Sequence, residues 1–181
     1  MAKATAGKMR LWLAVTAAVI VLDQLSKHLA GTALQLHEPL SVLPSLNLTL
    51  AYNTGAAFSF LADGTGWQRW FFVGLALLVS AIILRWLRSL GPGDCWSGTA
   101  LSLILGGALG NVLDRLVAGY VVDFIDVSYR AGSCLPLFTP VPIGGDGLEC
   151  HWPAFNLADS AIFVGAAMMV IETLRKPEAK S

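Results

Sequence analysis

Charge is scarce in this sequence of 181 residues, and its two signs balance. Charged residues make up only 13% of the chain, and 12 basic against 12 acidic residues give a formal net charge of zero. Without a basic excess, no bulk electrostatic attraction favours nucleic acid as a partner. The chain is instead 55% hydrophobic, with a mean hydropathy of +0.65. A soluble domain of this size is rarely so apolar, so the bilayer is the expected solvent.

Two common functional signatures are also missing. No serine stands in a nucleophile elbow, and the histidines at positions 28, 37 and 151 are scattered, so serine–histidine catalysis has little support. Gly106 and Gly110 form a small-xxx-small pair within an apolar segment, which lets helices approach closely. Because no strand precedes these glycines, a nucleotide-binding loop is not expected.

Four segments are apolar and about 20 residues long, enough to cross a hydrocarbon core of about 30 Å. They cover residues 11–29, 67–87, 97–116 and 156–174. The first has a basic start and small residues near its end, as in a secretory signal peptide. Asp23 and Lys27 interrupt it and further spans follow, so a retained helix is predicted. We expect one membrane domain over residues 1–181, an all-α membrane protein with a small β-rich extracytoplasmic platform.

The lysines and arginines predict the orientation of the four spans. Most of them flank the segment ends on the side of the two termini. The positive-inside rule therefore predicts cytoplasmic termini, with long outer loops at about residues 30–66 and 118–155.

The outer loops carry β-strand signals. Residues 46–52 alternate apolar and polar side chains, which predicts a strand with one apolar face. Residues 53–55 are typical of a turn, and residues 56–60 of a second extended piece. In the second loop, prolines disfavour helix, and residues 144–147 form a flexible turn.

Cysteine is limited to three residues. Cys95 lies in the short inner loop, whereas Cys134 and Cys150 share the second outer loop, where the compartment can be oxidising. A disulfide between these two and a pair of free thiols are equally open, because spacing alone does not fix the geometry. A metal site is the weaker hypothesis, since the spacing matches no strong ligand pattern. It would draw on Cys134, Asp146, Glu149, Cys150 and His151.

Three aspartates have local explanations. Asp23 lies four residues before Lys27, so the two share a helix face, and a snorkelling ion pair near the interface is the main interpretation. Asp114 directly precedes Arg115, which predicts a structural pair. Asp126 is interpreted as a solvated loop residue.

Asp123 and Asp159 stand apart, because no Lys or Arg lies at helical spacing from either. An ionised carboxylate is costly at membrane depth, so acids there usually have a function. Asn156 shares a helix face with Asp159, and Asn111 is a candidate for bonding backbone or substrate. Two acids near one membrane face are able to share a proton, one carboxyl activating water while the other donates to a carbonyl oxygen.

Five blocks of sequence, in the same order, resemble those of the bacterial lipoprotein signal peptidases (signal peptidase II). Together they span most of the chain and are highly specific. They are Asp23-Gln24-Leu25-Ser26-Lys27, Tyr52-Asn53-Thr54-Gly55-Ala56-Ala57-Phe58-Ser59, Gly106-Gly107-Ala108-Leu109-Gly110-Asn111-Val112-Leu113-Asp114-Arg115, Gly119-Tyr120-Val121-Val122-Asp123-Phe124 and Phe155-Asn156-Leu157-Ala158-Asp159.

The resemblance implies an aspartyl endopeptidase of the bacterial cytoplasmic (inner) membrane, with four transmembrane helices and no metal or cofactor. Its substrates would be prolipoproteins, cut before a diacylglyceryl-modified cysteine, and a globomycin-type cyclic peptide would inhibit it. The catalytic pair maps onto Asp123 and Asp159, with Asp23 and Lys27 in supporting roles. The residues around the substrate would be Asn53, Gly55, Asn111, Arg115, Asn156 and Ala158. The stretch from about 130 to 150 is longer than is usual in the family.

Two other classes of function compete with the peptidase. A small proton- or ion-coupled transporter would distribute its acids across the membrane depth and often contain a repeat. Here the acids gather toward one face, and no repeat is evident. A lipid-binding assembly factor would require no acid pair at all.

Overall fold

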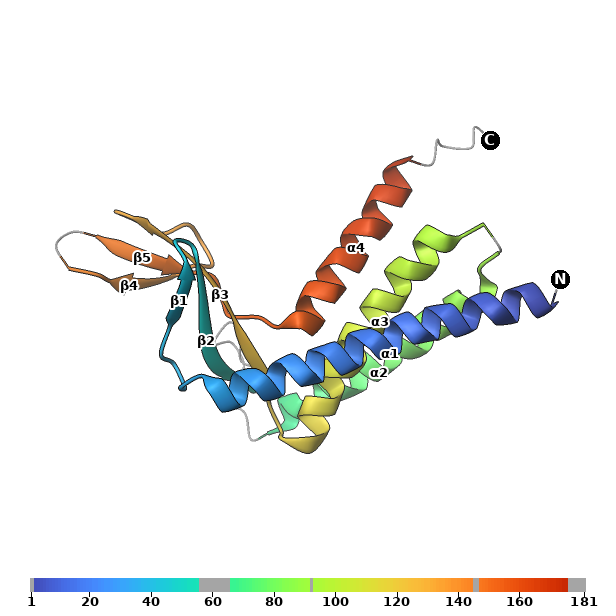
Figure 1. Cartoon of the computed structure of the whole chain (residues 1–181), viewed down its shortest axis with the longest axis horizontal. Helices are drawn as coiled ribbons and strands as arrows, with labels where there is room; N and C mark the ends of the chain where they lie inside the picture. The colour runs from blue at the N-terminus through green and yellow to red at the C-terminus, as the bar shows by residue number, and fades with distance from the viewer. Residues whose placement is uncertain (1, 56–65, 92, 145–146, 176–181) are drawn as a thin grey trace.

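The computed structural model describes residues 2–55, 66–91, 93–144 and 147–175, with side chains described from residue 7 onward. Four helices carry most of the chain (Figure 1): α1 (Ala2–Ala33), α2 (Trp67–Ser89), α3 (Cys95–Val117) and α4 (Leu157–Arg175). All four are long and apolar enough to cross a membrane, over Gly7–Ala33, Trp67–Ser89, Cys95–Val117 and Leu157–Arg175. The predicted spans are confirmed, with ends that differ by a few residues.

Helix α3 lies at the centre of the helical bundle. In its most apolar stretch of 18 residues, 56% of the residues are buried, against 22% in the same stretch of α1 and α2 and 11% in that of α4. A Cβ atom at Gly106 would lie 2.7 Å from the Cβ of Val19 in α1, and one at Gly107 would lie 2.7 Å from a side-chain carbon of Ile162 in α4. The glycines therefore let α3 approach both neighbours closely, which confirms the packing role predicted for this segment.

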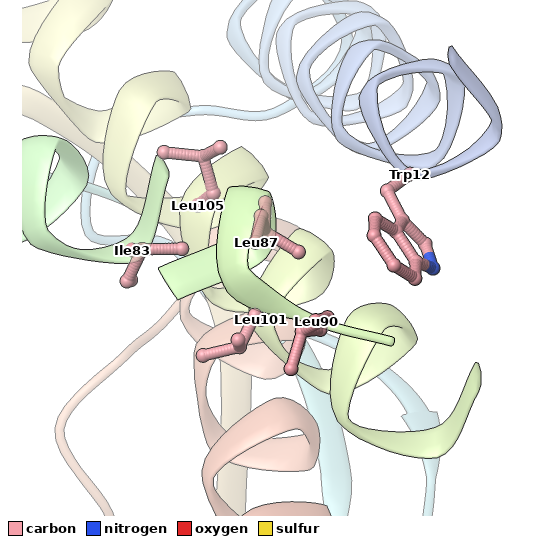
Figure 2. Close-up of a cluster of buried hydrophobic side chains, with 6 residues drawn as sticks. All are labelled: Trp12, Ile83, Leu87, Leu90, Leu101 and Leu105. Atoms are coloured by element: carbon pink, nitrogen blue, oxygen red, sulfur yellow. The ribbon is translucent and has the colours of Figure 1, made fainter. Parts of the chain in front are cut away.

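An apolar cluster holds three helices together away from the sheet (Figure 2). It consists of Trp12, Ile83, Leu87, Leu90, Leu101 and Leu105, all less than a tenth exposed. Many other large apolar side chains on the helices are exposed, as expected where lipid rather than protein covers them.

The strands form one antiparallel sheet of five, in the order β1-β2-β3-β5-β4. They are β1 (Leu40–Leu43), β2 (Leu46–Asn53), β3 (Val121–Ala131), β4 (Thr139–Pro142) and β5 (Leu148–His151). The sheet lies beyond the end of the bundle where α1 ends and α4 begins (Figure 1). The predicted β platform is therefore present, and β3, its longest strand, links the end of α3 to the rest of the sheet.

The strand predicted from alternation is β2, but its predicted single apolar face is wrong. The register with β3 shifts between Leu48 and Ala51, so β2 contains an extra residue there. Such a bulge interrupts the alternation of side chains between the two faces. Asn47 and Leu50 are consequently both buried, while Tyr52 is 43% exposed. Gly55 follows at φ +100°, as a turn requires, and the predicted extended piece at 56–60 lies outside the described residues.

Cys134 and Cys150 form a disulfide, with their Cα atoms 5.5 Å apart. This bond joins the turn after β3 to β5, which lies between β3 and β4 in the sheet. It also removes both thiolates from the ligand set of the metal hypothesis, and Asp146 of that set lies outside the described residues. Among the described residues, no group of three or more His, Cys, Asp and Glu is arranged to hold a metal ion. Cys95 is a free, exposed thiol.

Candidate active site

Asp123 lies on β3, where it pairs with Ala51 of β2. Its side chain is almost completely buried, and both of its carboxyl oxygens accept hydrogen bonds from amides. Asn156 Nδ2 donates to Oδ1 over 2.7 Å, and Asn53 Nδ2 donates to Oδ2 over 3.1 Å. No lysine or arginine among the described residues forms an ion pair with this carboxyl group.

Asp159 lies in the first turn of α4 and forms a capping box with Asn156. The backbone N–H of Asp159 donates to Asn156 Oδ1 over 2.9 Å, and the backbone N–H of Asn156 donates to Asp159 Oδ2 over 3.3 Å. The two side chains satisfy each other's backbone at the helix start, as in capping boxes with other residues. The spacing of three that placed them on one face therefore also orients the carboxyl of Asp159.

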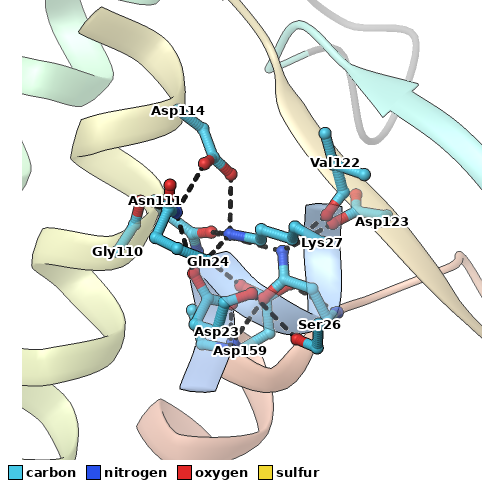
Figure 3. Close-up of polar contacts among 12 residues, drawn as sticks. Asp23, Gln24, Ser26, Lys27, Gly110, Asn111, Asp114, Val122, Asp123 and Asp159 are labelled. Carbon is cyan, nitrogen blue, oxygen red and sulfur yellow. Dashed lines mark hydrogen bonds and ion pairs between the residues drawn. The ribbon is translucent and has the colours of Figure 1, made fainter. Parts of the chain in front are cut away.

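Two asparagines connect the carboxyl groups of Asp123 and Asp159. Asn156 contacts both, through its side-chain amide on Asp123 and its backbone on Asp159. Asn111, on α3, donates from Nδ2 to Asp159 Oδ1 over 2.8 Å and accepts from Asn156 Nδ2 over 3.2 Å. Asn111 was predicted to bond either backbone or substrate. In the structure its side chain instead bonds the candidate catalytic carboxyl of Asp159. Figure 3 shows Asn111 in the same cluster as Asp123 and Asp159.

The pKa of Asp123 is raised from 3.8 to about 7, chiefly because burial disfavours the charged carboxylate and secondly because of the nearby charge of Asp159. The hydrogen bonds from Asn53 and Asn156, and the charge of Lys27, lower this pKa but do not offset the two larger effects. Desolvation and a like charge both disfavour ionisation of a carboxyl group. Asp123 therefore retains a proton up to neutral pH and is able to act as an acid.

The cluster around Lys27 is an ion-pair network inside the protein (Figure 3). Lys27 Nζ lies 2.8 Å from Asp23 Oδ2, 2.6 Å from Asp114 Oδ2 and 2.9 Å from Asn111 Oδ1. Gln24 donates to Asp114 Oδ1 over 2.7 Å. The predicted ion pair of Asp23 and Lys27 is confirmed, but Lys27 is 4% exposed and Asp23 is fully buried, so the predicted snorkelling to the interface is wrong. The ammonium group contacts carboxylates and an amide from two helices instead of reaching the interface.

Arg115 does not pair with Asp114, and that prediction is wrong as well. Successive residues on a helix point in different directions. Arg115 Nη1 donates to the backbone oxygen of Asn111 over 3.3 Å, and its guanidinium lies 5.3 Å from the ring centre of Phe72. Arg115 thus joins α3 to α2 beside the acid pair.

Gly55 and Ala158 support the site through their backbones. The Gly55 N–H donates to Asn53 Oδ1 over 2.9 Å and so orients the amide that contacts Asp123. A Cβ at Gly55 would lie 2.6 Å from the Phe72 ring, so no larger residue fits there without a shift. The Ala158 N–H donates to Asp23 Oδ1 over 2.9 Å, and Ala158 has no exposed surface. Their predicted place around the substrate stays a prediction.

Asp126 is buried, contrary to its interpretation as a solvated loop residue. Only 4% of its surface is exposed. Thr49 Oγ1 donates to it over 2.8 Å, and His151 Nδ1 lies 2.9 Å from Oδ1. No local sequence pattern indicates this contact, because the three residues come together only through the pairing of β2, β3 and β5.

Two hollows flank the acid pair, one on each side of the segment 152–155. A hollow of about 500 Å³ is lined by Trp152, Phe155, Asp159, Ser160, Phe163 and Val164. Another, of about 260 Å³, is lined by Ala51, Tyr52, Asn53, Thr54, Asp123, Pro153 and Ala154. Each carboxyl group therefore faces its own hollow, the Asp159 side largely apolar and the Asp123 side bordered by β2.

Known proteins are similar to this chain in sequence and in fold. A family model described as signal peptidase (SPase) II matches residues 15–175. A lipoprotein signal peptidase of Pseudomonas aeruginosa is 48% identical over 169 residues, covering 93% of this chain and 90% of the relative. One from Aeromonas hydrophila is 48% identical over 171 residues, covering 94% and 90%. A solved structure described as a bacterial membrane enzyme has a TM-score of 0.72 at 27% identity, covering 92% of this chain and 94% of that one.

Proposed function

Because the chain belongs to the signal peptidase II family, we propose that it is a multi-pass aspartyl endopeptidase that removes signal peptides from prolipoproteins. Cleavage would fall before the cysteine that carries the diacylglyceryl group. The observation that carries this proposal is the asparagine-bridged pair of Asp123 and Asp159, which has no cation paired to either carboxyl among the described residues. The transporter hypothesis has no support, since the family and its relatives are peptidases.

The reaction needs only the two carboxyl groups and water. Asp159 acts as the base: it takes a proton from a water molecule whose oxygen attacks the scissile carbonyl carbon. Asp123, protonated up to a pH of about 7, donates its proton to the carbonyl oxygen, and a gem-diol forms. Asp159 then returns a proton to the amide nitrogen while Asp123 takes one from a gem-diol hydroxyl. The C–N bond breaks, and both carboxyl groups recover their starting states.

Three asparagines orient the two carboxyl groups for this reaction. Asn53 and Asn156 each donate to Asp123, which fixes the plane of its carboxyl. Asn111 fixes Asp159 and is itself held by Lys27. Carboxyl groups positioned in advance lose little orientational freedom at the moment of reaction.

Substrate would enter from two sides. An extended peptide lies along the end of β2, beside the hollow at Asp123, where backbone groups are able to position it. The apolar hollow at Asp159 continues onto Phe163 and Val164, which are 75% and 48% exposed on α4. Acyl chains therefore stay in the bilayer while the scissile bond reaches the acid pair.

We further propose that the protein lies in the bacterial inner membrane with both termini in the cytoplasm. The distribution of Lys and Arg supports this orientation, and it places the sheet and the acid pair toward the outer face. A globomycin-type cyclic peptide is expected to compete with substrate at this site.

The test is cleavage by purified protein of one precursor prepared with and without its diacylglyceryl group. Mass spectrometry should find a free lipid-modified cysteine at the new N-terminus of the lipidated product. A much smaller kcat/KM is expected for the unlipidated precursor, because two acyl chains fix the depth of the scissile bond. Absence of cleavage of the lipidated precursor, or equal cleavage of both forms, would contradict the proposal.

A further inference from the structure

A hairpin in the second outer loop carries apolar side chains that no other described part of the chain covers. We call the described residues 134–144 and 147–151, which include β4, β5 and the disulfide, the outer hairpin. Figure 1 shows it projecting beyond the helices. Leu135 is 64% exposed and Leu137 is 60% exposed, and Val141 and Ile143 are each more than two-fifths exposed. Apolar side chains gathered in this way usually mark a surface that another apolar phase covers.

The sequence of this region is free of charge over a long stretch. No Asp, Glu, Lys or Arg occurs from Ala131 to Gly145, although charged residues stand directly before and after it. Arg130 and Glu149 face each other in the pairing of β3 with β5, and Glu149 also pairs with Val141, at the end of the hairpin nearest the β4–β5 turn. The charged pair therefore lies toward the β4–β5 turn, whereas the uncharged segment with Leu135 and Leu137 leads to the start of β4, where Phe138 contacts Trp152.

The backbone of the outer hairpin is strained at one of these exposed leucines. Leu137 has φ +76°, in the left-handed region that favours glycine. A bulky residue is held in such a conformation only where surrounding structure determines it, and such strain is common at functional positions. The disulfide at Cys134 and the pairing of β4 with β5 supply that structure on either side. The strain thus accompanies an outward-facing apolar side chain.

A row of aromatic rings connects the hairpin to the membrane-spanning part. Phe138 lies between Tyr129 and Trp152, with ring centres 5.0 Å and 5.2 Å apart. The Leu135 N–H donates to the Tyr129 hydroxyl over 2.7 Å, which ties the turn to β3. Tyrosine and tryptophan are the residues most typical of the boundary between water and bilayer.

Trp152 makes the apolar surface continuous with that of α4. It is 40% exposed and lines the same hollow as Phe163 and Val164, two exposed residues of a helix that can cross a membrane. Only 11% of the residues in the most apolar stretch of α4 are buried by protein, so lipid covers most of this helix. Trp152 thus borders a hollow on that helix and contacts Phe138, whose chain neighbour is the exposed Leu137.

We propose that the outer hairpin inserts its apolar side chains into the leaflet on the sheet's side, where lipid acyl chains cover Leu135 and Leu137. Arg130 and Glu149 then lie at the level of the lipid headgroups. This surface anchors the sheet, and with it β3 and Asp123, at a fixed depth. It is a lipid-binding surface separate from the acid pair and independent of whether the chain cleaves prolipoproteins.

The test measures depth directly, with the full-length protein in phospholipid vesicles. A nitroxide is attached through p-acetylphenylalanine at position 137, which leaves the three cysteines unmodified, and at position 130 as the matched control. Collision rates with oxygen, which concentrates in lipid, and with a water-soluble nickel chelate are compared. The ratio of oxygen to nickel collisions should be several-fold higher at 137 than at 130. Position 135 provides a second apolar site if labelling at 137 prevents folding.

Two results would overturn the proposal. Equal, nickel-dominated ratios at all positions would mean that the outer hairpin lies in water. A label at 137 shielded from both reagents, with dipolar broadening between labels, would mean that a second copy of the chain covers it. Neither result depends on cleavage activity, so the outcome is distinct from that of the precursor experiment.

Discussion

Two groups of carboxylates lie close together in this protein, yet their surroundings differ. Asp23 and Asp114 share the ammonium of Lys27, at 2.8 Å and 2.6 Å. Asp123 and Asp159 receive hydrogen bonds from asparagines and form no ion pair among the described residues. Ion pairing favours the charged form of a carboxyl group, whereas burial without a paired cation favours the neutral form, as the raised pKa of Asp123 shows. The comparison separates acids that hold the fold from acids able to react.

Asn111 joins the two groups. Its side-chain oxygen accepts from Lys27, and its Nδ2 donates to Asp159. The ion-pair network thus determines which way the amide of Asn111 points, and through it the orientation of the reactive carboxyl. Asp23 contributes a second link, because it accepts the Ala158 N–H in the first turn of α4.

The largest expected effect comes from removing the ability of the unpaired acids to transfer protons. Asp123→Asn and Asp159→Asn should each lower kcat/KM on a lipidated precursor by about 10³-fold or more, since each group transfers a proton in the reaction. Both variants should remain folded and inserted, as judged by yield and thermal unfolding. Activity near the wild-type level in either variant would exclude that residue from the reaction.

The next effect distinguishes the paired acids. Lys27→Met leaves two buried carboxylates without a cation and should lower the free energy of unfolding by about 3–5 kcal/mol. Arg85→Met is the matched control, because Arg85 is exposed on α2 and its loss should change stability by less than about 0.5 kcal/mol. Denaturant unfolding of both variants in micelles measures the difference. Equal stability of the two variants would show that the Lys27 network does not hold the fold.

The pH dependence of stability tests the environment of Asp123, the unpaired acid whose pKa is raised. The pKa of Asp123 is about 7 in the folded protein and 3.8 as its reference value, so the folded state holds a proton that the unfolded state releases. Its contribution to stability is complete below pH 3.8 and is lost as pH rises through about 7, a change of up to about 4 kcal/mol. Asp123→Asn does not titrate, so wild-type stability should fall relative to this variant over that range. A constant difference between the two would contradict the raised pKa.

The smallest effect is expected at Asp126, a buried acid outside the pair. Asp126→Asn weakens its contacts with Thr49 and His151, which should cost about 1–3 kcal/mol of stability. Its kcat/KM should stay within a few-fold of wild type, because Asp126 contacts neither of the two reactive carboxyls in the described structure. A loss as large as that of the Asp159 variant would place Asp126 among the reacting groups.

The helices and the second strand were predictable because they depend on local sequence, whereas the catalytic roles of Asp123 and Asp159 stay predictions. Span length follows from apolar runs, and the strand at 46–52 follows from alternation. Asp123 and Asp159 were identified because no base lies near either in sequence, and the family motifs include both. The capping box at Asn156 and Asp159 was also readable, since the spacing of three is its signature.

The errors concern contacts between distant parts of the chain. The partner of Asp114 is Lys27 on another helix, and no local spacing reveals how α1 packs on α3. The burial of Asp126 depends on His151, which reaches it across the pairing of β3 and β5. The bulge in β2 depends in the same way on register with a strand far along the chain.

The central claim is that Asp123 and Asp159 share one proton near neutral pH, and the pH profile of kcat/KM on a lipidated precursor tests it most directly. Because Asp123 must be protonated to donate to the carbonyl oxygen, the account predicts that kcat/KM falls as pH rises through about 7. Asp126→Asn should show the same midpoint. A kcat/KM that stays constant from pH 6 to about pH 9, well above this pKa, would contradict the account.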